Sequence, residues 1–155
     1  GWFHSLGLKA DGSIVAWGDN SVGQTNVPAP NTGFVAVSAG VVSSLGLKAD
    51  GSIVDGQINV PSPNAVFIAI VCAAHSLGLK ADGSIVAWGG SNEWGQTDVP
   101  SPNTGFVAVA AGGSQSLAIR EATEACCTAT TANGDYCEDL APSACAGLIS
   151  PGIAR

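Results

Sequence analysis

The sequence contains no methionine and little charge. Only 11% of its 155 residues are charged, and five Lys and Arg residues stand against 12 Asp and Glu residues, for a formal net charge of −7. The few bases are scattered, and Lys9, Lys48 and Lys80 recur at one position of a repeat without forming a cluster. Such a chain repels a polyanion, so we expect no nucleic-acid partner.

Two further absences concern location. The sequence has no run of about 18 apolar residues, so it predicts no membrane span. No initiator methionine or signal peptide is present, and the chain starts inside a repeat with Gly1, Trp2 and Phe3. We therefore interpret it as a segment of a longer protein whose targeting signal lies outside this sequence.

Catalytic signatures are also missing. No nucleophile stands beside a base, no acids are paired at catalytic spacing, and no phosphate-binding loop is found. This pattern predicts a protein that is not an enzyme and needs no cofactor or metal. The two histidines, His4 and His75, fill a repeated slot that Ser43 and Gln115 also occupy. Because a catalytic residue is not copied once per repeat, both are expected to make structural hydrogen bonds.

The main feature that the sequence does contain is one repeated stretch. The residues SLGLKADGSIV occur at 5–15, 44–54 and 76–86, and a decayed start, SLAIR, begins at Ser116. Apolar residues alternate in its first half, as in a strand with one buried face, and its second half is β-branched. The Asp-Gly pair between the halves predicts a hairpin with a two-residue type I′ turn. The repeated acids are therefore interpreted as turn residues: Asp11, Asp50 and Asp82.

The rest of each unit adds two extended pieces. One ends in proline at 24–28 and 96–100, as in an edge strand, and the other is the FVAV segment that starts at Phe34 and Phe106. Four antiparallel strands per unit predict an all-β protein made of β-propeller blades, in an incomplete arc of about three repeats. The second unit lacks six residues where the others carry AWG and a loop. The units recur about every 40 residues, at 4–42, 43–74 and 75–114, with a partial unit at 115–120.

The composition changes at Glu121, after which the repeat stops. Residues 121–155 carry four of the five cysteines: Cys126, Cys127, Cys137 and Cys145. This density predicts a small disulfide-stapled tail in an exported protein. A zinc site is the alternative, but the tail has no C-x₂-C pair and no histidine. The fifth cysteine, Cys72, replaces a small alanine of the other repeats and is expected to be a buried thiol.

The order of motifs in the unit resembles that of a known repeat family. HSL, the A-D-G turn, AWG-x-N and GQT-x-VP follow one another as in the repeat of the regulator of chromosome condensation superfamily. In length the unit is most similar to the short bacterial form that includes β-lactamase inhibitory protein II. The resemblance covers about residues 1–120 and implies a propeller of about seven four-stranded blades, which the repeats present here are too few to close.

The resemblance also implies where a partner binds. The inhibitor branch binds a protein enzyme through aromatic residues on loops at one face of the propeller. The eukaryotic exchange factor docks on nucleosomes through an arm for which this sequence has no counterpart. Carried over by position, the binding loops are residues 2–3, 21–22, 41–42, 93–94 and 113–114. Within them, the partner-binding candidates are Trp2, Phe3, Val22, Glu93 and Trp94.

Two classes of function remain open. The first is a protein-binding module of a secreted or cell-surface bacterial protein, with a partner that the sequence does not identify. The second is a structural scaffold, one piece of a large surface repeat protein, which fits the shortened second unit. An enzyme inhibitor and a nucleotide-exchange factor are narrower alternatives.

An incomplete arc also leaves apolar blade faces open, which predicts self-association. The residues expected on these faces are Leu6, Leu8, Val15 and Trp17 at one end, and Val107, Val109 and Leu117 at the other.

Overall fold

The structure, a computed structural model, describes residues 1–121, 126–131 and 134–138 as strands and connecting segments. The chain divides into two compact units, Gly1–Arg120 and Glu121–Arg155. The strands of the first unit are β1 (His4–Leu8), β2 (Ile14–Gly18), β3 (Phe34–Ala39), β4 (Ser44–Lys48), β5 (Ile53–Asp55), β6 (Phe67–Cys72), β7 (Ser76–Lys80), β8 (Ile85–Trp88), β9 (Phe106–Gly112) and β10 (Gln115–Arg120).

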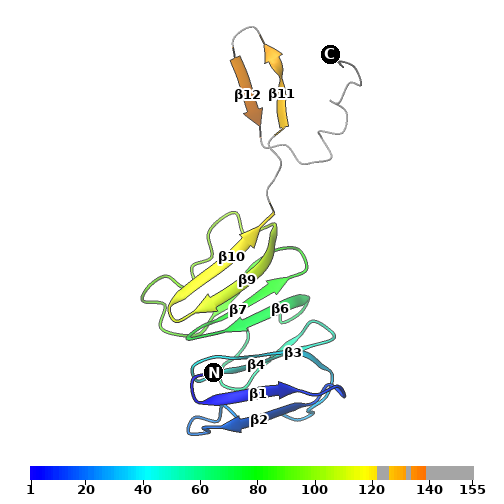
Figure 1. The fold of residues 1–155 in the computed structure, drawn as a ribbon, viewed down its shortest axis with the longest axis vertical. Coiled ribbons are helices and arrows are strands. Elements are labelled where there is room, and N and C mark those ends of the chain that lie inside the picture. The colour runs from blue at the N-terminus through cyan, green and yellow to red at the C-terminus, as the bar shows by residue number, and fades with distance from the viewer. Residues whose placement is uncertain (122–125, 132–133, 139–155) are drawn as a thin grey trace, which may run out of the picture. The chain divides into compact units, whose positions relative to one another are not determined.

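The first unit is an arc of four small antiparallel sheets, which we number as blades. Blade 1 is β1–β2, blade 2 is β3–β4–β5, blade 3 is β6–β7–β8 and blade 4 is β9–β10. The blades follow one another in space in the order of the chain (Figure 1). This arrangement confirms the predicted all-β propeller arc.

The number of strands per blade differs from the prediction of four. Blades 2 and 3 have three strands each and blades 1 and 4 have two, and the segments at 24–28, 57–61 and 96–100 form turns and loops without a ladder. The first of these segments runs into Val27-Pro28-Ala29-Pro30, and prolines have no N–H to donate to a neighbouring strand.

The boundaries of the blades also differ from those of the sequence repeats. Strand β3 closes the first repeat but pairs with β4 of the second, from Phe34 opposite Lys48 to Ala39 opposite Ser44. Strand β6 pairs with β7 of the following repeat in the same way. Each repeat therefore supplies the first strand of the next blade, which joins neighbouring repeats by backbone hydrogen bonds.

The Asp-Gly pairs lie at hairpin tips, but not in a type I′ turn. In the first hairpin Gly12 has a φ of 76°, whereas Asp11 does not have a positive φ. The Lys9 N–H donates to Ser13 O and the Gly12 N–H to Lys9 O, which closes a three-residue loop. The Asp11 carboxylate accepts the Ser13 N–H and hydroxyl at 2.9 and 2.6 Å. The longer turn needs a positive φ only at glycine, so an aspartate fits before it.

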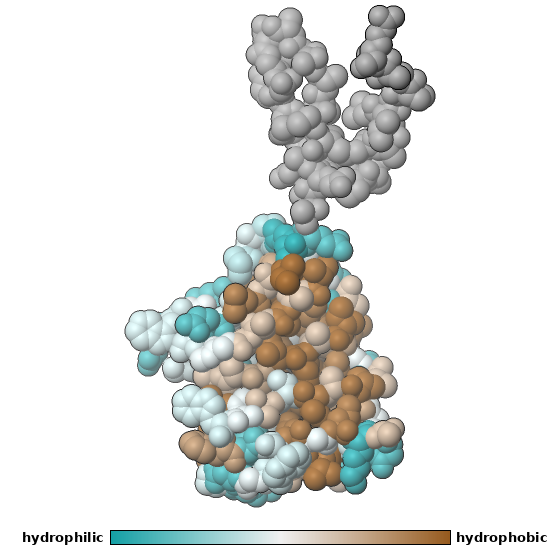
Figure 2. All heavy atoms as spheres, in the orientation of Figure 1, coloured by the Kyte–Doolittle hydropathy of each residue, from teal (hydrophilic) through white to brown (hydrophobic). Residues whose placement is uncertain are grey.

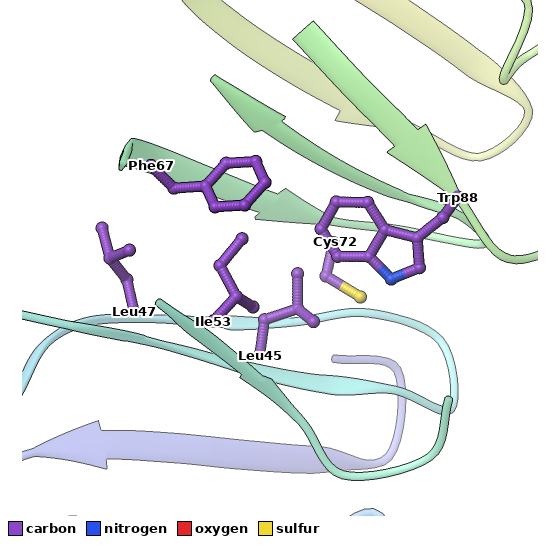
Figure 3. Close-up of a cluster of buried hydrophobic side chains, with 6 residues drawn as sticks. All are labelled: Leu45, Leu47, Ile53, Phe67, Cys72 and Trp88. Carbon is purple, nitrogen blue, oxygen red and sulfur yellow. The ribbon is translucent and has the colours of Figure 1, made fainter. Parts of the chain in front are cut away.

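The core lies between blades rather than within them. Leu45, Leu47 and Ile53 of blade 2 point toward blade 3, and all three are less than 5% exposed (Figure 3). They meet Phe67, Cys72 and Trp88 of blade 3, which form the other half of one buried cluster. Leu77, Leu79 and Ile85 make the equivalent contact between blades 3 and 4. Each blade thus has a leucine face that packs against the aromatic face of the next blade.

The glycine in the middle of each SLGLK strand makes this packing possible. A Cβ atom on Gly78 would stand 2.6 Å from Cε1 of the Phe67 ring, and one on Gly46 would stand 2.5 Å from the ring of Phe34. The isoleucine of the preceding blade, Ile53, also reaches within 3.3 Å of the Gly78 position. The glycines therefore form flat platforms that phenylalanine and isoleucine side chains cover.

We predict that Gly78→Ala lowers the free energy of unfolding by about 1–3 kcal/mol, because the new methyl group displaces the Phe67 ring. Gly7→Ala is the matched control at the same repeat position. Its Cβ would meet Trp17 at 3.4 Å or more and Val15 O at 3.9 Å, which are ordinary contacts, and its effect should stay within about 0.5 kcal/mol. Urea unfolding of both variants measures the difference, and equal effects would show that the platform does not limit packing.

The structure explains how the second repeat tolerates its missing residues. Strand β5 ends early at Asp55, whose carboxylate accepts the N–H groups of Gln57 and Ile58 and turns the chain. The other Asp55 oxygen accepts the indole N–H of Trp88 at 3.2 Å. A cavity of about 20 Å³ lies between blades 1 and 2, lined by Leu6 and Gly56 among others. That volume holds about one water molecule.

Two residues that were expected on open blade faces lie between blades instead. Leu6 lines this cavity, and Val109 packs against the Leu77 cluster.

In the second unit the structure describes one hairpin. Strand β11 (Cys126–Thr131) pairs with β12 (Gly134–Glu138), and the register sets Cys127 opposite Cys137. Cys145 lies outside the described residues. The prediction that the four tail cysteines form disulfides therefore stays a prediction.

Candidate functional site

The five candidate residues lie at one rim of the arc. Strands β1, β4, β7 and β10 begin at this rim, and the strands that pair with them end there, as the pairs His4–Gly18 and Ser76–Trp88 show. The loops at this end are residues 1–3, 19–23, 40–43, 56–57, 73–75, 89–95 and 112–114. We call this end the aromatic rim. The Asp-Gly hairpins lie at the opposite end of the strands, the hairpin rim.

Aromatic side chains protrude from the rim in two places. Trp2 and Phe3 are 71% and 69% exposed, and their rings meet edge to face with centroids 6.3 Å apart. Trp94 is 76% exposed, on the loop of the third repeat. Val22 holds the equivalent place in the first repeat and is also exposed, as is Glu93 beside Trp94. The structure thus brings Trp2 and Phe3 into contact and presents Trp94 from a separate loop.

A polar scaffold holds the loop of Trp94. The Gln96 side chain is 8% exposed, and its Oε1 accepts the backbone N–H of Trp94 at 3.0 Å. Asn92 accepts the Thr97 N–H through its side-chain oxygen and donates its amide to Asp98. These bonds fix the backbone on both sides of Trp94, so its indole ring is displayed from an ordered loop.

The first repeat builds the same scaffold around Val22. Gln24 is 2% exposed and accepts the Val22 N–H at 2.9 Å, while Asn20 accepts the Thr25 N–H. Gln24 also donates to Asp19 at 2.7 Å. Sequence reasoning treated the GQ motif only as a family mark and missed its role in holding the loop. Its recurrence with an asparagine four residues earlier was the available signal.

The bases of the described chain lie at one rim, beside the turn acids Asp11, Asp50 and Asp82. Four of the five bases end or follow the strands at the hairpin rim: Lys9, Lys48, Lys80 and Arg120. Three of them lie over phenylalanine rings, as Lys80 does over Phe67 at 5.1 Å. The aromatic rim instead carries acids, among them Asp19, Asp55 and Glu93. The Ser21 hydroxyl donates to Asp19 and lowers the pKa of that carboxyl, so it stays ionised. The aromatic rim is therefore apolar and negatively charged.

Beneath the rim, the histidines make the structural hydrogen bonds that the sequence predicts, and these bonds join successive blades. His4 Nε2 lies 2.9 Å from the Ser44 hydroxyl of the next blade, and His75 lies 2.7 Å from that of Ser116. The Ser44 hydroxyl donates its hydrogen to Gln24 O at 2.6 Å, so it must accept from His4 Nε2. Both histidines are at most 2% exposed, and their Nδ1 atoms have no partner in the described structure. Burial lowers the pKa of both rings, which keeps them neutral.

This geometry predicts a pH dependence of stability. A histidine whose pKa is lowered by folding stabilises the protein fully above the ordinary value of 6.5 and loses that contribution as the pH falls below it. We expect the free energy of unfolding to drop between about pH 7 and pH 5. His75→Gln, the residue found in this slot at Gln115, should reduce the drop. Urea unfolding across this pH range is the measurement. If the free energy of unfolding of the variant fell as steeply with pH as that of the wild type, His75 would not be the source of the drop.

The described residues were also searched for metal-binding groups and membrane-spanning helices. Within it, no three His, Cys, Asp or Glu side chains gather as a metal-binding group. No helix in these residues has the length and hydropathy that a bilayer crossing requires.

A comparison with known families gives the class of repeat. Residues 1–24, which hold the first hairpin and the start of its loop, match the Regulator of chromosome condensation (RCC1) repeat. Residues 1–24 thus carry a repeat of the regulator of chromosome condensation type. Among the curated proteins, none matches the sequence.

Solved structures with this fold include yeast and plant proteins. The ectodomain of the receptor kinase CR4 of Physcomitrella patens has a TM-score of 0.64 and 22% identity over 87% of this chain and 38% of its own. Prp20p of Saccharomyces cerevisiae has a TM-score of 0.63 and 17% identity over 77% of this chain and 41% of its own. The ACR4 ectodomain of Arabidopsis thaliana has a TM-score of 0.57 and 23% identity over 72% and 41%. This chain therefore spans about two fifths of each, and the likeness is one of fold.

Proposed function

We propose that the chain is a non-enzymatic, protein-binding repeat module of a secreted bacterial protein, and that it binds its partner through the aromatic rim. The observation that supports this most is the exposure of Trp94 on a loop held by buried Gln96. An exposed aromatic side chain on an ordered loop loses little conformational entropy when it is buried at an interface. Repeat folds of this class commonly act through protein contacts, and yeast Prp20p has binding properties to Gsp1p and histones.

The charge of the rim indicates the chemistry of the partner. The Asp19 N–H donates to Phe3 O and Glu93 precedes Trp94, so these two acids lie next to the aromatic groups, and the bases of the described chain lie at the hairpin rim. A surface of this kind complements a basic protein surface with apolar pockets. We infer that binding is driven by burial of the aromatic rings and oriented by these acids, so that it weakens as salt concentration rises.

A structural scaffold is the second candidate. The closed turn at Asp55 supports it, because the second repeat loses its AWG loop and still packs between its neighbours. A scaffold needs no exposed tryptophan, and a substitution at the rim would then have no effect on any partner.

Trp94→Val tests the proposal sharply, because Val22 already stands at this position in the first repeat. We expect the variant to bind the partner about 2 kcal/mol more weakly, as at an interface hot spot, while its melting temperature stays unchanged. The bait is the 155-residue chain, exposed to secreted bacterial proteins. Proteins enriched on the wild type over the variant are then purified and titrated by calorimetry.

Ile68→Ala is the matched control, since Ile68 is 58% exposed on β6 and lies away from the rim. It should bind like the wild type. A titrated partner that binds wild type and Trp94→Val equally would refute the aromatic rim as the binding surface, and the scaffold would then be preferred.

Export of the protein has its own test. We predict that protein made in an oxidising compartment has one free thiol, the buried Cys72, and that the four cysteines of residues 121–155 are oxidised. The register that sets Cys127 opposite Cys137 supports this. Thiol titration in denaturant without reductant makes the count, and five free thiols would contradict the prediction.

A further inference from the structure

A chain of hydrogen bonds runs from a buried histidine of blade 3, through a serine of blade 4, to the loop of Trp94. The Ser116 hydroxyl donates to Gln96 O at 2.7 Å, so its oxygen accepts from His75 Nε2, also at 2.7 Å. Gln96 in turn accepts the Trp94 N–H through its side chain. The next blade therefore holds the backbone carbonyl of Gln96, and the side chain of Gln96 holds Trp94.

The first repeat contains the same chain of hydrogen bonds. His4 Nε2 lies 2.9 Å from the Ser44 hydroxyl, which donates to Gln24 O at 2.6 Å. Gln24 accepts the Val22 N–H through its side chain. Because the same atoms meet at the same repeat positions twice, the connection between histidine, serine and loop is a built feature of the repeat.

The second repeat indicates that this connection serves the loops and is not needed to join blades. Ser43 stands in its histidine slot, and Ser76, the counterpart of Ser44, contacts Cys72 Sγ at 3.6 Å. Blades 2 and 3 still share the buried cluster of Figure 3, and a hydrophobic band runs along the arc (Figure 2). The same repeat has lost its AWG loop. In the described repeats, the histidine and serine thus pair where a full rim loop is present.

The two loops depend on their serine to different degrees. Gln24 has a second strong partner, because its Nε2 donates to Asp19 Oδ2 at 2.7 Å. Gln96 Nε2 lies 3.5 Å from Ser91 O, which is a long and weak hydrogen bond. Loss of the serine hydroxyl would leave Gln24 anchored by a carboxylate and Gln96 without a comparable anchor.

We propose that Ser116, oriented by His75, is a positioning residue for recognition by Trp94. It holds Gln96, and through Gln96 it holds the loop in the conformation that presents the indole ring to the partner. A loop ordered before binding loses less conformational entropy when it meets its partner, so this bond raises affinity without touching the partner. The inference rests on the proposed role of the aromatic rim and adds that the rim is assembled between blades.

Hydrogen exchange on the free 155-residue chain, followed by NMR, tests the positioning without any partner. Ser116→Ala should speed exchange of the Trp94 amide about fivefold or more, as for the loss of one hydrogen bond. Ser116→Thr keeps the hydroxyl at an exposed position and should restore slow exchange. Ser44→Ala is the matched change, and it should speed exchange at Val22 by a smaller factor and leave Trp94 unchanged. A Trp94 amide that is unchanged in Ser116→Ala, or that responds equally to Ser44→Ala, would overturn the proposal.

The His75 ring supplies a spectroscopic signature of the same arrangement. Its Nε2 carries the proton, because the hydrogen of the Ser116 hydroxyl is used on Gln96 O, and its Nδ1 has no partner in the described structure. Nitrogen-15 NMR at neutral pH should therefore find Nε2 protonated and Nδ1 bare. A proton on Nδ1 would mean that the serine donates to the histidine instead of to Gln96, and would contradict the proposal.

A double-mutant cycle tests the effect on binding. The probe is the protein that is enriched on the wild type over Trp94→Val and purified as described above. Ser116→Ala should bind it about fivefold more weakly, Ser116→Thr should bind like the wild type, and Ser116→Ala should add nothing in the Trp94→Val background.

The outcomes separate this inference from the proposed function. If the probe binds Ser116→Ala as tightly as the wild type, or if the two substitutions act additively, the positioning role is wrong and the aromatic rim stands. If hydrogen exchange follows the expected pattern but no protein is enriched on the wild type, the proposed function is wrong, and the role of Ser116 in recognition is wrong with it.

Discussion

The fold is stabilised by the contact between the leucine face of one blade and the aromatic face of the next. A blade of three short strands buries little by itself, and Leu45, Leu47 and Ile53 become core residues only when blade 3 covers them. The glycine platform lets the Phe67 ring pack onto β7 of its own blade, because the ring lies where any larger residue would place its Cβ. The stability of each repeat therefore depends on its neighbours, as in other repeat proteins.

The same constraint explains which parts of the repeat can vary. The strand from Ser76 to Lys80 is buried except at its end, whereas Trp94 and its neighbours contribute nothing to the cluster between blades. The second repeat loses that loop and its tryptophan, and Asp55 closes the turn and accepts the Trp88 indole from the next blade. Since stability lies in the strands and their buried polar links, the rim loops are free to carry recognition.

Sequence reasoning predicted the parts of the fold that local pattern dictates. Alternation in SLGLK and the β-branched return strand indicated the hairpins, and the recurrence of His4 and His75 in one slot indicated structural hydrogen bonds, which the structure confirms. It did not predict that β3 pairs with the next repeat, because strand pairing is non-local and either neighbour satisfies the pattern. The turn type was wrong because Asp-Gly suits both a two-residue turn and the longer loop that Lys9 and Ser13 close.

The candidate site shows more clearly which features sequence reasoning can and cannot predict. That Trp2, Phe3 and Trp94 are exposed at one rim follows from strand direction once the hairpins are known. The buried glutamine that orders each loop is a tertiary feature, since Gln96 acts on Trp94 through its backbone and leaves no mark on hydrophobic pattern. The pairing of each repeat's last strand with the next repeat is likewise a tertiary feature that the sequence pattern does not show. It joins each repeat to the next through a backbone ladder inside one blade, as β3 of the first repeat does with β4 of the second.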